Sequence, residues 1–263
     1  MNARRPAAAA VALFCFIFLY APSAAVAVFS FNQTKYGLAW KGFTWDWYLR
    51  LFQNQAVLEA ALNSLLTAGI STALATILGT SLALGLDRFP WPPRLKAAVD
   101  VVVHLPVVTP DIILAAALVL TFSLFQSLTG LLEMGRTTLI IGHVTFQISF
   151  VALVVRSRLA ALGRELDEAA RDLYASGLYL FLRVTLPLIW PGILAGAMLA
   201  FTLSLDDFII SFFTHGPDSV TLPIYIYSSV RRGISPEIHA LSTLVLLATM
   251  LLVLTAERLL PRS

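Results

Sequence analysis

The chain has 263 residues, of which 58% are hydrophobic and only 13% are charged. A soluble domain carries about a quarter charged residues, so this composition excludes an ordinary globular protein and indicates that most of the chain lies in a membrane. The net charge of +3 is too small to indicate a nucleic-acid partner, and the single cysteine, Cys15, excludes a disulfide framework and a thiolate metal site.

Six apolar stretches are long enough to cross a bilayer, which takes about 20 residues. They predict transmembrane helices near 7–29, 61–86, 97–123, 137–155, 191–213 and 239–257. The chain is therefore predicted to be all-α, with six transmembrane helices that form a single transmembrane domain over 1–263. No part of it resembles a separate soluble domain.

The first span has two readings. Arg4 and Arg5 precede an apolar run, and the small residues at 25–27 would suit a signal peptidase. However, the apolar run continues through Phe29 and is long enough to span, which favours an uncleaved helix with a kink near Pro22.

The segment after it, 32–60, carries several Trp and Tyr residues. These rings favour the membrane–water interface, so the segment is either an interfacial belt or a docking surface for a partner.

Small and helix-breaking residues shape the next two spans. The second span is rich in Ala, Gly, Ser and Thr, which predicts close packing against other helices. The turn at 87–96 holds three prolines and cannot continue a helix. The third span is predicted to be broken by Pro106 and Pro110, and it carries Asp111.

The distribution of basic residues predicts the orientation. With the N-terminus inside, 12 Lys and Arg residues fall in inside segments and 6 in outside segments. Cytoplasmic loops carry the excess of basic residues, so both termini and the loop at 164–191 are predicted to be cytoplasmic.

That loop is the longest charged stretch in the chain. Asp167 and Arg171 are four residues apart, so on a helix they are neighbours that can form an ion pair. Pro187 and the apolar residues after it close the stretch. The pattern predicts a short helix outside the membrane that leads into a span.

The order of residues in the loop resembles the cytoplasmic loop of ABC-importer permeases. Glu168-Ala169-Ala170 and Leu186-Pro187 match the family's motif, while Tyr174 stands where the family usually has glycine. In that family the loop is the coupling helix, which sits in a groove of the ATP-hydrolysing subunit. The resemblance implies that the coupling residues are Glu168, Ala169, Ala170, Arg171, Gly177, Leu186 and Pro187.

Four further segments resemble the spermidine/putrescine branch of these permeases: 109–113, 201–213, 216–217 and 235–237. The resemblance implies a permease subunit of the bacterial inner membrane that imports polyamines from the periplasm to the cytoplasm. It also implies three partners, namely a second homologous permease subunit, a dimer of ATP-binding subunits and a periplasmic binding protein. ATP hydrolysis is then expected on the partner subunit, so the chain itself is not an enzyme and needs no cofactor.

Polar residues inside spans are the candidates for the substrate pathway. A charge at a helix centre costs about 2.5–3.5 kcal/mol on insertion scales, so Asp111, Asp206 and Asp207 are expected to line a pathway or to be paired. On a continuous helix Asp206 and Asp207 point about 100° apart, so only one faces a given groove squarely. In the fourth span, His143 and Gln147 lie four residues apart and are predicted to form hydrogen bonds between helices.

A polyamine pathway should combine spaced carboxylates with aromatic faces. The three aspartates supply the charges, and Phe208 and Phe212, with Phe213 as a further candidate, supply cation–π contacts. The competing interpretation is that Asp206 and Asp207 are structural hydrogen-bond acceptors.

The same residues are compatible with three other functions. The first is the same importer class with another small-solute cargo, and the second is an intramembrane hydrolase that uses Asp111 with Asp206 or Asp207. A passive channel is the third, but neither it nor a hydrolase has a use for the loop motif. No phosphate-binding G-x-x-x-x-G-K-[ST] loop or H-E-x-x-H motif is present, and the four histidines have no metal-ligand spacing.

Overall fold

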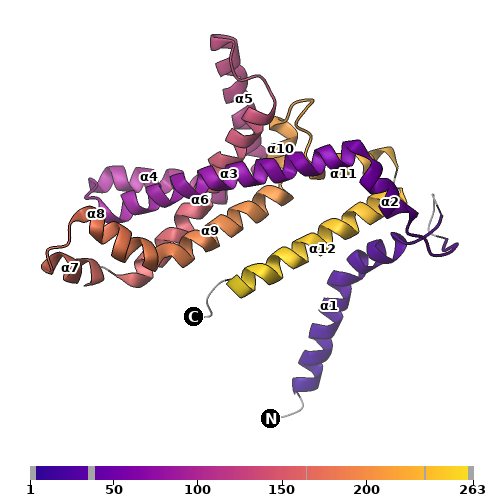
Figure 1. The fold of residues 1–263 in the computed structure, drawn as a ribbon, viewed down its shortest axis with the longest axis horizontal. Helices are drawn as coiled ribbons and strands as arrows, with labels where there is room; N and C mark the ends of the chain where they lie inside the picture. The colour runs from indigo at the N-terminus through magenta and orange to yellow at the C-terminus, as the bar shows by residue number, and fades with distance from the viewer. Residues whose placement is uncertain (1–3, 35–38, 164, 234, 260–263) are drawn as a thin grey trace. The chain divides into compact units, whose positions relative to one another are not determined.

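The computed structural model describes residues 4–34, 39–163, 165–233 and 235–259, and its regular elements are all helices (Figure 1). In chain order they are α1 (Arg4–Phe29), α2 (Asp46–Gln53), α3 (Gln55–Arg88), α4 (Pro93–Val108), α5 (Asp111–Thr129), α6 (Arg136–Leu162), α7 (Glu165–Asp172), α8 (Gly177–Leu180), a π-helical turn (Phe181–Thr185), α9 (Leu186–Asp206), α10 (Ile209–Thr214), α11 (Leu222–Arg232) and α12 (Pro236–Leu259). The all-α prediction is confirmed. Arg164, the first residue of the predicted loop, lies outside the described residues.

Five of the described helical segments are long and apolar enough to cross a membrane. They are Ala8–Phe29, Gln55–Arg88, Asp111–Thr129, Arg136–Leu162 and Gly177–Asp206. The predicted sixth span coincides with a shorter apolar segment, Pro236–Leu251.

The third predicted span, 97–123, is two helices rather than one. Pro110 has no N–H group and disfavours helical geometry in the residue before it. Thr109 is accordingly extended, with ψ at 135°, and it ends α4 while Pro110 leads into α5. Pro106, predicted to be a second break, is accommodated inside α4.

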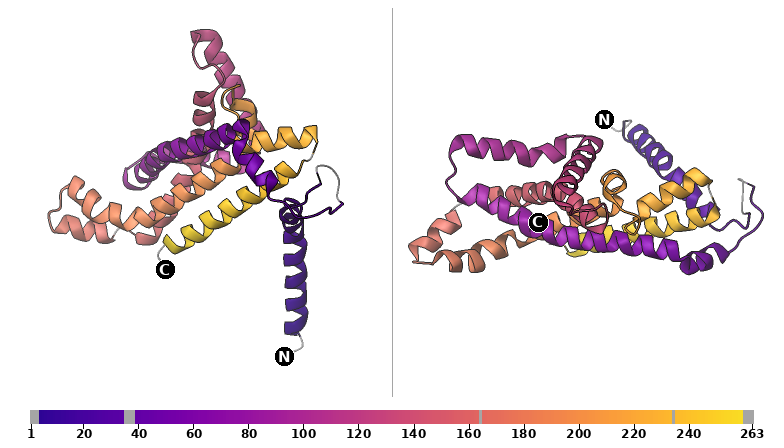
Figure 2. Two further views of the ribbon diagram at one scale, coloured as in Figure 1. Left: turned by 45° about the vertical axis from the view of Figure 1, so that its right-hand side comes forward. Right: turned by 90° about the horizontal axis from the view of Figure 1, so that it is seen from above.

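The chain forms two compact units: unit 1 comprises Met1–Glu59 and Tyr225–Glu257, and unit 2 is mainly Ala60–Ile224. In unit 2, α6 packs along α9, α4 packs against α6, and α10 packs against α5 and α6 (Figures 1 and 2). The largest buried cluster of unit 2 comes from α3, α4, α6 and α9, and consists of Ala83, Leu86, Val103, Val151, Ala152, Val155, Leu159, Ile189, Ile193 and Ala200. The unit is thus centred on α6.

A glycine lets α3 approach α6 closely. A Cβ atom at Gly79 would lie 2.8 Å from both the carbonyl oxygen of Ile148 and the Cβ of Val151, which no real side chain tolerates. Ala68, Ala75 and the other buried small residues of α3 fit the same requirement. The prediction that the second span is a packing helix is confirmed.

In unit 1, the segment before α2 is organised by one buried side chain. The Asn32 carboxamide accepts the backbone N–H of Lys41 and donates to the carbonyl of Ala39. The Trp47 indole donates to the Asn32 carbonyl at 2.8 Å. The rings of Phe31, Phe43, Trp45 and Tyr48 pack on one another around this loop.

Candidate functional site

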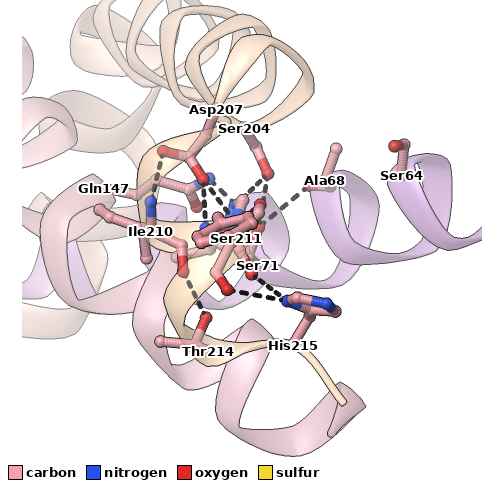
Figure 3. A network of polar contacts seen from close by, with 12 residues as sticks. Ser64, Ala68, Ser71, Gln147, Ser204, Asp207, Ile210, Ser211, Thr214 and His215 are labelled. Atoms are coloured by element: carbon pink, nitrogen blue, oxygen red, sulfur yellow. Dashed lines mark hydrogen bonds and ion pairs between the residues drawn. The ribbon is translucent and has the colours of Figure 1, made fainter. Parts of the chain in front are cut away.

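The fifth predicted span ends earlier than expected, at Asp206. Asp207 is extended, with ψ at 122°, and a second short helix, α10, begins at Ile209. The Asp207 carboxylate accepts the backbone N–H groups of Ile210 at 3.2 Å and Ser211 at 2.7 Å (Figure 3). A carboxylate is stabilised at such a helix start, since the first N–H groups have no partner within the helix. The expectation that the two aspartates share one continuous helix is therefore wrong.

A fully buried histidine ties the break between α9 and α10 to α6. His143 Nδ1 lies 2.7 Å from Ser204 Oγ, and its Nε2 lies 2.9 Å from Ser211 Oγ. The same Nε2 lies 3.4 Å from Asp207 Oδ2. The contacts of both ring nitrogens fix how the imidazole is oriented, and with it the position of the Asp207 carboxylate.

A second buried side chain extends this network to α3. Gln147 Nε2 donates to Ser71 Oγ at 3.1 Å and to the Ala200 carbonyl at 3.2 Å, and Ser71 Oγ lies 3.4 Å from Ser204 Oγ (Figure 3). The network therefore joins α3, α6, α9 and α10. The prediction that His143 and Gln147 form hydrogen bonds between helices is confirmed.

A cavity of about 410 Å³ opens beside this network. Its lining comes from α4, α5, α6, α9 and α10, and consists of Pro106, Asp111, Phe146, Phe150, Leu203, Asp206, Asp207, Phe208, Ile209 and Ile210. The volume falls in the range of about 300–1,000 Å³ that is typical of small-molecule sites. All three predicted aspartates and Phe208 line the cavity, whereas Phe212 is not part of the lining and contacts Phe208, with the two ring centroids 5.4 Å apart.

The three aspartates differ in exposure and in hydrogen bonding. The Asp207 side chain is only 9% exposed and both of its oxygens are hydrogen-bonded. Asp111 and Asp206 are exposed, and among the described residues neither carboxylate forms a hydrogen bond or an ion pair. The cavity thus offers two carboxylates available to a ligand and a third that is held in place by the protein.

The predicted loop contains the predicted short helix, α7. Glu168, Ala169 and Arg171 are exposed on it, while Ala170 is half-buried. Gly177 begins α8, whose first turn is capped by Ser176 Oγ, which accepts the Tyr179 N–H. The motif residues Leu186 and Pro187 form the first turn of α9. From Glu165 on, the loop is therefore helical apart from one turn at 173–176.

Tyr174 lies in that turn with φ at +59°. A left-handed conformation costs a residue with a side chain about 1–2 kcal/mol relative to glycine. The backbone geometry explains why glycine suits this position. Tyr174 is 97% exposed, and Leu173 beside it is 82% exposed, so the turn presents apolar groups outward.

One contact of the loop has no signal in the sequence. Among the described residues, Asp167 forms its ion pair with Arg88 at the end of α3, at 2.8 Å, and not with Arg171 as the four-residue spacing predicts. Arg88 precedes a proline-rich turn, and nothing in that pattern points to a partner 79 residues away.

The two groups of site residues lie at opposite ends of α9. The loop leads into Leu186, and the cavity residues begin near Leu203. A helix of 21 residues is about 30 Å long. The structure therefore brings most of the predicted pathway residues together at one cavity and keeps the predicted coupling residues in one loop, with a membrane-length helix between the two sets.

Comparison with known proteins identifies a matching family. Residues 75–261 match the family model described as "Binding-protein-dependent transport system inner membrane component". This range holds α4 to α12, and hence both groups of site residues.

Three curated relatives span nearly the whole chain. The putrescine transport system permease protein PotI of Escherichia coli is 41% identical over 246 residues, covering 92% of this chain and 86% of the relative. The spermidine/putrescine permease protein PotC of Haemophilus influenzae is 36% identical, covering 92% and 91%. A putative 2-aminoethylphosphonate permease protein, PhnV of Salmonella typhimurium, is 28% identical, covering 98% and 96%.

Solved structures share the fold. A permease chain of a bacterial alginate ABC transporter superposes with a TM-score of 0.74 at 20% identity, covering 94% of this chain and 91% of that chain. A chain of the MetNI methionine ABC transporter gives a TM-score of 0.63 at 17% identity, covering 83% and 98%.

Proposed function

The chain belongs to the family of binding-protein-dependent transport system inner-membrane components, and we propose from this that it is a permease subunit of an ATP-driven polyamine importer. In this proposal it moves spermidine and putrescine from the periplasm to the cytoplasm. It forms part of the membrane pathway, and ATP hydrolysis lies in a separate subunit. The observation that carries the proposal is the 41% identity to a putrescine permease over 92% of the chain.

The cavity supports a cationic cargo. Asp111 and Asp206 are assigned to contact the ammonium groups, because their carboxylates are exposed in the cavity and face no partner among the described residues. Phe208 offers a ring to the methylene chain and the cation, with Phe212 behind it. Asp207 is assigned to holding the turn between α9 and α10, since backbone amides already occupy its carboxylate.

Two contacts at opposite ends of unit 2 support the proposed grouping of segments on each side of the membrane, and the excess of basic residues assigns the cytoplasmic side. Arg88 of the predicted inner turn contacts Asp167 of the predicted inner loop. At the other end, Asn63 binds both Arg136 and the carbonyls of Asp218 and Val220, and all of these lie near the outer ends of predicted spans. With the side that is richer in Lys and Arg inside, both termini are cytoplasmic in this proposal, and the chain acts as one transmembrane domain. Three of these basic residues, Lys35, Arg164 and Arg262, lie outside the described residues.

The partners follow from the same proposal. The exposed face of α7, with Glu168, Ala169 and Arg171, docks on one subunit of an ATP-binding dimer. A second, homologous permease completes the pathway, and a periplasmic protein delivers the cargo. The apolar residues of α1 are not buried within the described chain, so in this proposal they contact lipid or the second permease.

Uptake by vesicles that carry the reconstituted complex tests the cargo. Radiolabelled putrescine and spermidine should accumulate only when ATP and the binding protein are both present. Accumulation of 2-aminoethylphosphonate instead would keep the importer class and replace the cargo. No ATP-dependent uptake of any of these solutes by an intact complex would contradict the polyamine proposal.

A further inference from the structure

An ion pair outside the cavity joins two segments that are distant in the sequence, the end of α3 and α7. Arg88 Nη1 lies 2.8 Å from Asp167 Oδ2, and the two side chains are only 19% and 15% exposed. Ion pairs this well shielded from water are screened less by salt than surface pairs. Removing one partner would leave the other charge partly buried and without its counterion.

Asp167 also contacts the segment that follows the loop. Thr185 Oγ1 donates to Asp167 Oδ1 at 3.4 Å, and Thr185 is the last residue of the π-helical turn before α9. One carboxylate therefore joins α7 to both α3 and the start of α9. α7 is the element proposed to dock on the ATP-binding subunit. If α7 moves, the contacts of Asp167 would therefore displace α3 and the start of α9 with it.

The position of Arg88 on its helix is fixed by the turn that follows. Pro90 and Pro92 stop α3, and the Trp91 indole donates back to the Gly85 carbonyl at 2.9 Å. The guanidinium also lies 3.4 Å from Asp87, so it is held by two carboxylates. Because these contacts hold the end of α3, a displacement of the Arg88 side chain would displace the helix itself.

From Arg88, α3 leads directly to the buried network beside the cavity. Gly79 lies against α6 two turns further along, and Ser71 joins Gln147 and Ser204 in the network that ends at Asp207. Ser71 and Arg88 are 17 positions apart on the helix, a distance of about 25 Å along its axis. The ion pair and the cavity are thus connected by one rigid element.

We infer that Arg88 and Asp167 are positioning residues of the coupling step, and that their ion pair transmits the movement of α7 to α3 and to the cavity wall. This inference rests on the proposed function. It adds a role for two residues that is distinct from docking, because it concerns the inner side of α7 and not its exposed face.

The test uses the reconstituted complex with Asp167→Asn, Arg88→Gln and the double variant. Each should retain its ATP-binding subunit on purification and should still hydrolyse ATP. Uptake per ATP should fall in each single variant by a factor on the order of 5 to 100, the usual range of coupling between sites. If the two residues act through each other, the double variant should be no worse than the poorer single variant. Effects that multiply in the double variant, or an unchanged uptake per ATP in either single variant, would overturn the inference.

A second readout does not depend on the cargo. Leu203 lines the cavity, so a Leu203→Cys variant in a Cys15→Ala background reports its accessibility to a thiol reagent. Trapping with ATP and vanadate should change the labelling rate in this background and should no longer do so once Asp167→Asn is added. An identical response with and without Asp167→Asn would contradict the link. If the complex imports no polyamine yet shows the expected loss of response, the cargo proposal fails and the link stands.

The chain supplies a matched control. Arg156 Nη1 lies 2.6 Å from Asp100 Oδ1 and joins α6 to α4, and the two side chains are 25% and 32% exposed. This ion pair includes no residue of the described part of the loop. Asp100→Asn should keep the wild-type uptake per ATP. An equal fall in this control would show a general loss of order near these helix ends and would overturn the assignment to Arg88 and Asp167.

Discussion

At the scale of single residues, environment decides what each carboxylate can do. Asp206 and Asp207 are neighbours in the chain, yet one is exposed to the cavity and the other is bound by two backbone N–H groups and a histidine. The helix break between them produces this difference. Their roles can therefore be separated by substitutions that preserve volume.

Asp206→Asn should lower polyamine uptake sharply and leave thermal stability close to wild type, because its carboxylate supports no other described group. Asp207→Asn should lower the stability of the purified subunit by about 1–3 kcal/mol, because its amide nitrogen cannot accept a backbone N–H. Uptake assays paired with thermal unfolding in detergent would distinguish the two effects. Normal uptake in both variants and in the double variant would leave these residues as packing groups only.

Glu168 lies on the exposed side of α7, one position after the buried-side Asp167. Glu168→Lys should leave the chain inserted but reverse a charge at the proposed docking face, so co-purification of the ATP-binding subunit and uptake should both fall. Glu133→Lys, an exposed carboxylate in the segment between α5 and α6, serves as the control and should retain both. Normal uptake in Glu168→Lys would show that α7 is not the docking element.

At the scale of elements, local chemistry in the sequence predicted much of the arrangement. Pro110 predicted the break between α4 and α5, the charged stretch predicted α7, and the spacing of His143 and Gln147 predicted their shared face. The break at Asp207 escaped prediction, because hydropathy continues across it and the interruption arises from a side chain that binds backbone N–H groups. The Arg88–Asp167 pair escaped for a related reason, since contacts between distant segments leave no periodic signal.

The small residues of α3 permit a matched test of helix packing. Gly79→Ala should destabilise the subunit by about 1–3 kcal/mol, because its Cβ would overlap α6. Gly69→Ala, on the same helix with no atom within 4 Å, should be neutral or stabilising, since alanine favours helices by about 1 kcal/mol. Thermal unfolding of the two purified variants checks this, and equal stability would contradict the close approach of α3 and α6.

At the scale of the whole molecule, and apart from the buried network of His143 and Gln147, the polar contacts described here gather at two ends of the transmembrane unit. Two ion pairs lie at the end that is rich in basic residues, Arg88 with Asp167 and Arg156 with Asp100. Asn63 and the segment before α11 form the polar contacts at the other end. This division predicts which parts of the chain a reagent can reach from each side of the membrane.

In a Cys15→Ala background, Ser176→Cys should be labelled only from the cytoplasm, and Asp218→Cys only from the periplasm. Both positions are exposed, whereas Thr214, near Asp218 in the chain, is fully buried and would not react from either side. Impermeant thiol reagents applied to intact cells and to inverted vesicles provide the measurement. Periplasmic labelling of Ser176→Cys would reverse the orientation, and with it the coupling proposal.

The break at Thr109 also has a consequence for biosynthesis. With 16 residues, α4 is about 24 Å long, shorter than the roughly 30 Å hydrocarbon layer, and it carries Arg94, Lys96, Asp100 and His104. On leaving the translocon α4 is therefore too short and too polar to insert stably on its own, and α6, the helix against which it packs, is synthesised later. We expect nascent chains stopped before Arg136 to leave α4 open to added protease and chains extended past Leu162 to protect it, whereas equal protection at both lengths would show that α4 inserts alone.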